Sequence, residues 1–114
     1  MKLSLAFRFL STNKDYPSLI TQQVKSNPIV MYSRTNCQQC NKAKLLFSEY
    51  KLTPYTIEID QQEDATSLRE AVESLTKQKR TPMIFIKGES IGGLGGLKNM
   101  LKNKQIQADL QNLK

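Results

Sequence analysis

Residues 29–50 read IVMYSRTNCQQCNKAKLLFSEY, and this stretch decides the fold. Its first four residues form an apolar run, which is typical of a buried strand. Beyond the two cysteines, the side chains Ala43, Leu46, Phe47 and Tyr50 recur at i, i+3, i+4 and i+7, which is one face of an α-helix. The stretch therefore predicts a strand, a short loop and a Cys-x-x-Cys motif that leads directly into a helix.

The flanking residues extend this unit into an α/β pattern. A preceding helix is expected from Tyr16 to Ser26, because Pro28 forces an extended conformation on the residue before it. Downstream, the patterns predict a strand at 54–59, a helix at 65–75, a strand at 81–86, a short strand at 90–91 and one or two helices over 97–113. A right-handed crossover makes the first two strands parallel, and a hairpin makes the last two antiparallel. We therefore expect an α/β fold with a four-stranded mixed sheet and helices on both of its faces.

Length and composition limit the classes of protein to which this chain can belong. A chain of 114 residues buries one small core, which excludes a two-domain enzyme. With 39% hydrophobic and 24% charged residues, it is neither disordered nor fibrous. Its apolar runs are shorter than the roughly 18 residues that a membrane helix needs, so we expect no membrane partner.

Cysteine is the source of chemistry in this sequence. The chain has no His, which removes the commonest general base and the commonest metal ligand. Its only cysteines, Cys37 and Cys40, are too few for a disulfide framework. They are also too few for a structural zinc site, unless a second chain or a non-protein thiol adds ligands. A redox role is the leading interpretation, and two small buried hydrophobic residues are the alternative.

The position of the motif predicts a different role for each sulfur. At the first turn of a helix, Cys37 faces unpaired N–H groups and the positive end of the helix dipole, and Arg34 lies three residues away. We therefore expect its pKa to be lowered. Cys40 lies one turn deeper on the same face, within reach of a disulfide with Cys37. Cys37 is predicted to be the nucleophile and Cys40 the resolving cysteine.

Two further motifs are candidates for substrate binding. Pro82 begins a strand, and a cis Thr81-Pro82 bond would turn the Thr81 backbone toward an extended, peptide-like substrate. An ordinary strand-initiating proline is the alternative. Gly92 and Gly93 precede a helix, where they let a ligand approach the backbone and a carboxylate bind at the helix N-terminus. For these glycines the alternative is a tight turn.

Charge is unevenly distributed along the chain. The overall net charge is +7, and residues 77–104 hold seven basic side chains against Glu89 alone, whereas residues 58–73 hold six acids against Arg69. The chain has no Trp and no recognisable nucleic-acid motif, so nucleic acid is not expected as a partner. A small anionic substrate fits the basic cluster better, and a solvated surface is the alternative.

Several stretches of the sequence match one family. They are Ser33–Cys37 with Cys40–Lys44, Pro54-Tyr55 with Glu58–Asp60, Thr81-Pro82 with Phe85-Ile86, and Ile91–Gly93. Together they resemble a dithiol glutaredoxin of the thioredoxin superfamily, over roughly residues 18–113. The resemblance implies a thioredoxin-like fold. It also implies reduction of protein disulfides and of glutathione mixed disulfides, with glutathione as electron donor and no obligatory metal.

The resemblance also implies a role for each site residue. Cys37 takes the glutathionyl group, and Cys40 resolves protein disulfides. Arg34 pairs with a glutathione carboxylate, Thr81-Pro82 binds the cysteinyl backbone, and Gly92-Gly93 belongs to the glutamyl end of the same groove. The implied partners are glutathione, disulfide-bonded or glutathionylated proteins and, indirectly, the glutathione reductase system. We expect a monomer.

Three departures from the family pattern bear on this expectation. Gln38-Gln39 stands where the family usually has Pro-Tyr, and Arg80-Thr81-Pro82 stands where it commonly has Thr-Val-Pro. Gly95-Gly96 stands where an acidic or hydroxyl pair is usual. Because glycine offers no acceptor for the ammonium group of glutathione, we expect weaker glutathione binding, which Gly96→Asp should tighten.

Two other functions are compatible with the motif. In an iron–sulfur carrier, two chains would each offer Cys37, and two glutathione thiols would complete four sulfur ligands. A thioredoxin-like reductase would receive electrons from a flavoprotein instead of glutathione.

The first sixteen residues form a separate, basic segment. They carry Lys2, Arg8 and Lys14 and have no acid before Asp15, which resembles a mitochondrial presequence. A basic tail or part of a first helix is the alternative. We expect residues 1–16 to be an extension and 17–114 to be the glutaredoxin domain. The expected location is a reducing compartment, the mitochondrial matrix or the cytosol, without secretion.

Overall fold

The computed structural model describes residues 15–112, so the expectation for the basic segment over residues 1–14 lies outside the described residues. Within the described range, four strands form one sheet in the order β2-β1-β3-β4. They are β1 (Ile29–Ser33), β2 (Tyr55–Glu58), β3 (Met83–Ile86) and β4 (Glu89–Gly92). β1 is parallel to β2 and antiparallel to β3, and β3 is antiparallel to β4. The predicted mixed sheet is confirmed.

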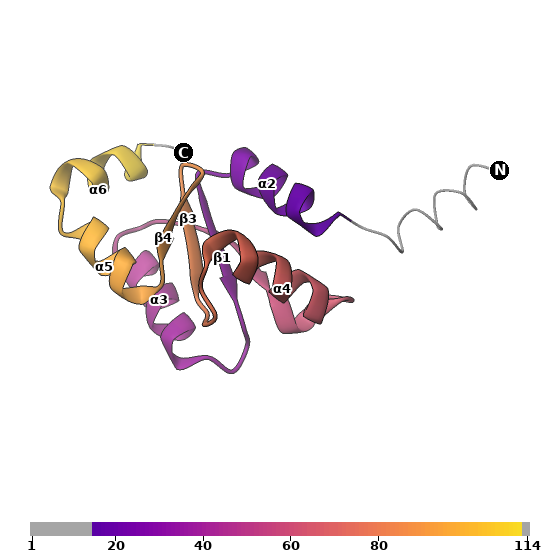
Figure 1. Cartoon of the computed structure of the whole chain (residues 1–114). Helices are drawn as coiled ribbons and strands as arrows, with labels where there is room; N and C mark the ends of the chain where they lie inside the picture. The colour runs from indigo at the N-terminus through magenta and orange to yellow at the C-terminus, as the bar shows by residue number, and fades with distance from the viewer. Residues whose placement is uncertain (1–14, 113–114) are drawn as a thin grey trace, which may run out of the picture.

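Helices cover both faces of this sheet (Figure 1). One face carries α2 (Tyr16–Ser26) and α4 (Ala65–Thr76), which follows the short 3-10 helix η1 (Ile59–Gln61). The other face carries α3 (Gln38–Glu49), α5 (Leu94–Leu101) and α6 (Lys104–Gln111). The sequence predicted the helices but not η1. Among the described residues, none of these helices has the length and apolar character needed to cross a membrane.

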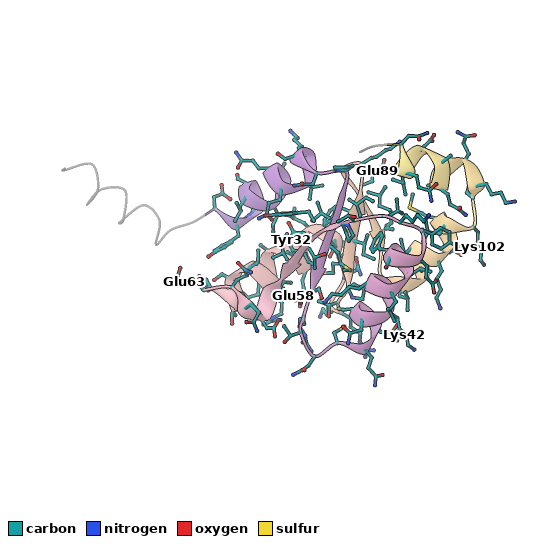
Figure 2. The ribbon with its side chains drawn as sticks, turned by 180° about the vertical axis from the view of Figure 1, so that it is seen from behind. Tyr32, Lys42, Glu58, Glu63, Glu89 and Lys102 are labelled. Carbon is teal, nitrogen blue, oxygen red and sulfur yellow. The ribbon has the colours of Figure 1, made fainter. Side chains whose placement is uncertain are left out.

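Alternation of side chains along the central strands builds a core on each face of the sheet. Val30 and Tyr32 of β1 pack with α2 and α4, whereas Ile29 and Met31 pack with α3 and α5. β3 divides its four residues between the two cores in the same way. Tyr32 lies inside the molecule (Figure 2), and its hydroxyl donates to Gln23 Oε1 at 2.6 Å. Because β1 and β3 are buried on both faces, both read as continuous apolar runs in the sequence.

Side-chain caps determine where most of the helices begin. Asp15 accepts from the backbone N–H of Ser18 at 3.2 Å at the start of α2, and Asp64 accepts from that of Ser67 at the start of α4. Asn103 caps α6 in the same manner. At the start of α3, this position is occupied by a cysteine.

Candidate active site

Cys37 caps helix α3 with its sulfur. Its backbone is extended, with φ −126° and ψ 112°, and the helix begins at Gln38. The Sγ atom accepts a hydrogen bond from the backbone N–H of Cys40 at 3.1 Å, as the oxygen of an ordinary N-cap side chain would. Cys37 therefore lies one position before the predicted first turn, where its sulfur satisfies one of the free N–H groups of the helix N-terminus.

The two sulfurs of the motif differ in exposure. Both cysteines are free thiols in this structure. Cys37 is half-buried, whereas Cys40 is 0% exposed and belongs to the buried side of α3. A first cysteine that is more exposed than the second is what the position of the motif at a helix start predicted.

Thr81 contacts Cys37 from the opposite side of the site. The Thr81-Pro82 peptide bond is cis, which is the first of the two possibilities that the sequence left open for this proline. The Thr81 hydroxyl donates to Cys37 Sγ at 3.3 Å, and the thiol of Cys37 donates to the Thr81 carbonyl oxygen at 3.6 Å. Sequence reasoning assigned only the backbone of Thr81 to the site. The signal for its side chain was the presence of a threonine where the family commonly has valine.

Hydrogen bonds lower the pKa of Cys37. Partial burial works to raise the pKa of this thiol, but hydrogen bonds from the side chains of Cys40 and Thr81 and from the backbone N–H groups of Cys40 and Gln39 outweigh it. The prediction of a lowered pKa is therefore supported, but its cause differs in part. The leading causes are these hydrogen bonds and not the guanidinium of Arg34, which is exposed.

The pKa of Cys40 moves in the opposite direction. Burial raises it, and so does the hydrogen bond to the sulfur of Cys37. Because the two pKa values are pushed apart, the first thiolate of the pair forms at Cys37, the sulfur that reaches the surface.

Cys37 opens into a groove with a volume of about 270 Å³. Its other lining residues are Arg34, Arg69, Glu73, Lys79, Arg80, Thr81 and Met83. The structure thus brings Arg34 and Thr81, two of the predicted site residues, to the same groove as Cys37. A larger hollow of about 500 Å³, between α3 and β2, contains neither cysteine.

Arg69 also lines the groove, although no motif in the sequence had singled it out. It lies on α4, and its Nη1 atom pairs with Glu73 Oε2 at 3.1 Å one turn along the helix. Lys79 and Arg80, by contrast, belong to the basic segment that the charge distribution had marked. The prediction of a basic surface near an anionic substrate thus included two of the four cations of the groove.

Another hollow, of about 260 Å³, adjoins the Cys37 groove, because Arg34 and Arg69 line both. It also contains Asp60, which accepts from the backbone N–H of Thr35 at 3.1 Å and from the Thr35 hydroxyl. The hydrogen bond from this hydroxyl lowers the pKa of Asp60. These contacts fix the loop between β1 and α3 to η1, and so fix the segment that carries Arg34 and Cys37.

Gly92 and Gly93 lie beside the Thr81-Pro82 loop rather than in the lining of the Cys37 groove. Gly92 has φ +95°, a conformation that favours glycine. Gly93 caps α5, and a Cβ atom there would come within 3.2 Å of the Pro82 carbonyl oxygen. The two glycines therefore bring the N-terminus of α5 next to the cis-proline loop.

Gly96 has no space for a side chain. A Cβ atom on Gly96 would overlap the backbone carbonyl oxygen of Ile91, whereas a Cβ atom on Gly95 would meet nothing within 4 Å. The expectation that Gly96→Asp tightens glutathione binding is therefore wrong, because the substitution would push α5 away from β4. Gly95 is the position at which an acid can be introduced.

Among residues 15–112, no group of three or more His, Cys, Asp and Glu side chains is arranged to hold a metal ion. An iron–sulfur cluster on the described part of the chain would therefore need ligands from outside it, as the sequence-based alternative assumed.

Comparison with known proteins places this site in a family. The Glutaredoxin family model matches residues 29–91, which is more than half of the chain. The chain belongs to the glutaredoxin family. With Cys37 and Cys40 it has the dithiol form of the motif, and family membership supports glutathione-dependent thiol oxidoreduction at the level of the family.

Individual relatives agree with the family model. Glutaredoxin-C4 of Arabidopsis thaliana is 34% identical over 74 residues, which are 65% of this chain and 55% of that protein. Monothiol glutaredoxin-S6 of Oryza sativa subsp. japonica is 32% identical over 97 residues, covering 84% of this chain and 74% of that protein. The chain spans little more than half the length of the first curated relatives it matches, 55% and 57%.

A solved structure supports the fold. The crystal structure of a buckwheat glutaredoxin–glutathione complex superposes with a TM-score of 0.78 and 31% identity, over 84% of this chain and 87% of that chain. The predicted thioredoxin-like fold is confirmed.

Proposed function

We propose that this protein is a glutathione-dependent thiol-disulfide oxidoreductase that reduces protein disulfides and glutathione mixed disulfides. The observation that carries the proposal is the environment of one sulfur. Cys37 Sγ caps α3, accepts hydrogen bonds from the Cys40 N–H and the Thr81 hydroxyl, and opens into a groove lined by cations. A thiolate that is stabilised and accessible in this way is the attacking species in thiol-disulfide exchange.

Reduction of a glutathione mixed disulfide uses Cys37 alone. The Cys37 thiolate attacks the glutathionyl sulfur, the disulfide bond to the substrate cysteine breaks, and the substrate leaves as a thiolate that takes up a proton. Cys37 then carries the glutathionyl group. The thiolate of a second glutathione attacks that glutathionyl sulfur, releases Cys37 as a thiolate and leaves as oxidised glutathione. Overall, the substrate sulfur is reduced from disulfide to thiol and the sulfur of the second glutathione is oxidised from thiol to disulfide, while the glutathionyl sulfur keeps its oxidation state and leaves in oxidised glutathione.

Reduction of a protein disulfide also needs Cys40. Cys37 attacks one sulfur of the disulfide, and Cys40 then attacks Cys37 Sγ, which frees the reduced substrate and forms the Cys37–Cys40 disulfide. Two glutathione molecules reduce this disulfide and leave as oxidised glutathione. Because Cys40 is buried, it is suited to this intramolecular step and not to the first attack.

The charge of the groove supports glutathione as the reductant. Arg34 pairs with one glutathione carboxylate, and the backbone of Thr81-Pro82, which lies beside the sulfur of Cys37, binds the cysteinyl part. Gly92-Gly93 and the N-terminus of α5 hold the glutamyl carboxylate through backbone N–H groups. This chemistry needs a pool of reduced glutathione, so we propose the cytosol or the mitochondrial matrix as its location.

A coupled assay tests the proposal. A mixed disulfide of glutathione and 2-mercaptoethanol is supplied with glutathione, glutathione reductase and NADPH, and NADPH oxidation is followed. Turnover that depends on glutathione and is lost in Cys37→Ser supports the proposal. The proposal would be refuted if turnover occurred only when a thioredoxin reductase replaced glutathione and glutathione reductase. Visible absorbance of the protein purified with glutathione would point instead to an iron–sulfur carrier.

A further inference from the structure

The groove beside Cys37 carries more positive charge than glutathione neutralises. Its lining holds Arg34, Arg69, Lys79 and Arg80 against the single carboxylate of Glu73, a net charge of +3. A glutathionyl group has two carboxylates and one ammonium group, so it brings a net charge of −1 at neutral pH. Glutathione therefore leaves a positive surplus beside the reacting sulfur.

The surplus can be assigned to particular side chains. Arg69 is paired with Glu73 at 3.1 Å, so these two charges offset each other. Arg34 also lines the hollow that contains Asp60, whose carboxylate accepts hydrogen bonds from Thr35. Lys79 and Arg80 are the remaining cations.

Lys79 and Arg80 are exposed, and among residues 15–112 neither forms an ion pair within 4.0 Å. They directly precede Thr81, whose hydroxyl and carbonyl both contact Cys37 Sγ. Since consecutive Cα atoms are about 3.8 Å apart, both residues lie within about 8 Å of Thr81 along the backbone. Both residues are exposed and line the groove into which Cys37 opens, so their charges lie at its edge, close to the sulfur that a substrate must reach.

Few acids of the acidic segment lie close to these cations. Of the six acids of residues 58–73, Glu73 lines the Cys37 groove and Asp60 lines the adjoining hollow. The four cations of the groove therefore still outnumber the two acids in and beside it.

We propose that Lys79 and Arg80 select glutathionylated protein substrates that carry Asp or Glu side chains next to the modified cysteine. The inference rests on the proposed function and adds the class of protein substrate to it. The glutathionyl group occupies the groove with Arg34, and the acidic residues of the substrate pair with the two cations at the rim. Arg80 stands where the family commonly has threonine, so one of the two cations departs from the family pattern.

The test compares two glutathionylated peptides that differ only in having Glu or Lys on both sides of the modified cysteine. We expect kcat/KM to be about three- to tenfold higher for the Glu peptide at low ionic strength, since an exposed ion pair contributes little individually and two of them act together here. The preference should approach one at about 0.5 M salt, where exposed charges are screened.

Matched variants assign the preference to the two residues. The double variant Lys79→Gln/Arg80→Gln should lose it. The control Lys87→Gln/Lys102→Gln removes the same charge at exposed positions, the β3–β4 turn and the C-terminal end of α5, and should keep it.

The mixed disulfide of glutathione and 2-mercaptoethanol is the reference substrate in every assay. Equal turnover of both peptides by the wild-type protein, with normal activity on the reference, would overturn the inference and leave the proposed function intact. So would an equal loss on both peptides and on the reference in Lys79→Gln/Arg80→Gln, which would show that these cations bind glutathione itself. Failure of the wild-type protein on the reference would instead overturn the proposed function.

Discussion

Replacement of Thr81 by valine tests whether the Thr81 hydroxyl helps to lower the pKa of Cys37. The substitution keeps the shape of the side chain but removes the hydroxyl that donates to Cys37 Sγ at 3.3 Å. A hydrogen bond to a charged group contributes about 1.5 to 3 kcal/mol, and the length of this bond and the half-buried position of Cys37 favour the lower end. About 1.5 kcal/mol is roughly a tenfold change in the ionisation equilibrium, so Thr81→Val should move the titration of Cys37 upward by about one pH unit.

The assay is the rate of Cys37 alkylation by iodoacetamide as a function of pH, with the modified cysteine identified by mass spectrometry. Because the thiolate is the reacting form, the variant should react more slowly on the acidic side of its inflection. At alkaline pH it should react slightly faster, since nucleophilicity rises with the pKa of the thiol. Thr81→Ser, which keeps a hydroxyl, is the control and should titrate like the wild-type protein. Coincident curves for Thr81→Val and wild type would refute the role of this hydrogen bond.

Three other outcomes follow from the structure. Cys37→Ser should abolish all turnover, whereas Cys40→Ser should keep activity on glutathione mixed disulfides and lose activity on protein disulfides; equal losses would contradict the assigned roles. Gly95→Asp should lower the KM for glutathione by on the order of tenfold, because the new carboxylate supplies an acceptor for the ammonium group of glutathione. Gly96→Asp should instead lower Tm sharply, because its side chain would overlap the backbone of Ile91. An unchanged KM in a folded Gly95→Asp protein would count against a glutamyl subsite at the N-terminus of α5. The hydrogen bond from Thr35 lowers the pKa of Asp60 below its ordinary value of 3.8, so the Asp60 carboxylate stabilises the fold fully above pH 3.8 and loses this contribution as the pH falls through the folded-state pKa. The urea midpoint of the wild-type protein should therefore fall over this pH range by more than that of Asp60→Asn. Parallel curves of urea midpoint against pH for the two proteins would contradict this role.

The sequence predicted those parts of the fold that depend on local pattern. β1 and β3 are central strands that are buried on both faces, so each is a continuous apolar run that stands out from its surroundings. The position of Cys37 at a helix start follows from the apolar face that begins just after it. The short helix η1 was missed because Ile59–Gln61 has too few residues to show a period.

The contact of the Thr81 hydroxyl with Cys37 depends on pairing between distant parts of the chain. β1 and β3 are antiparallel with Tyr32 opposite Met83, so the residues before Met83 lie across from the residues after Tyr32. This register brings Thr81 to a cysteine 44 positions away. Arg69 reaches the groove for a similar reason, because the location of α4 on the sheet is set by packing of its buried residues and not by its charged ones.

Gly96 shows how a family pattern can suggest the wrong cause. From the sequence, a glycine where relatives usually have an acidic or hydroxyl residue indicates a ligand contact that has been lost. In the structure, the same glycine lets α5 pack directly against the backbone of Ile91 at the end of β4. The N-terminus of this helix is held beside the Pro82 carbonyl by Gly93. A side chain at Gly96 would therefore move the helix end on which the glutamyl subsite is proposed, so close packing at this position and the geometry of the groove cannot be changed independently.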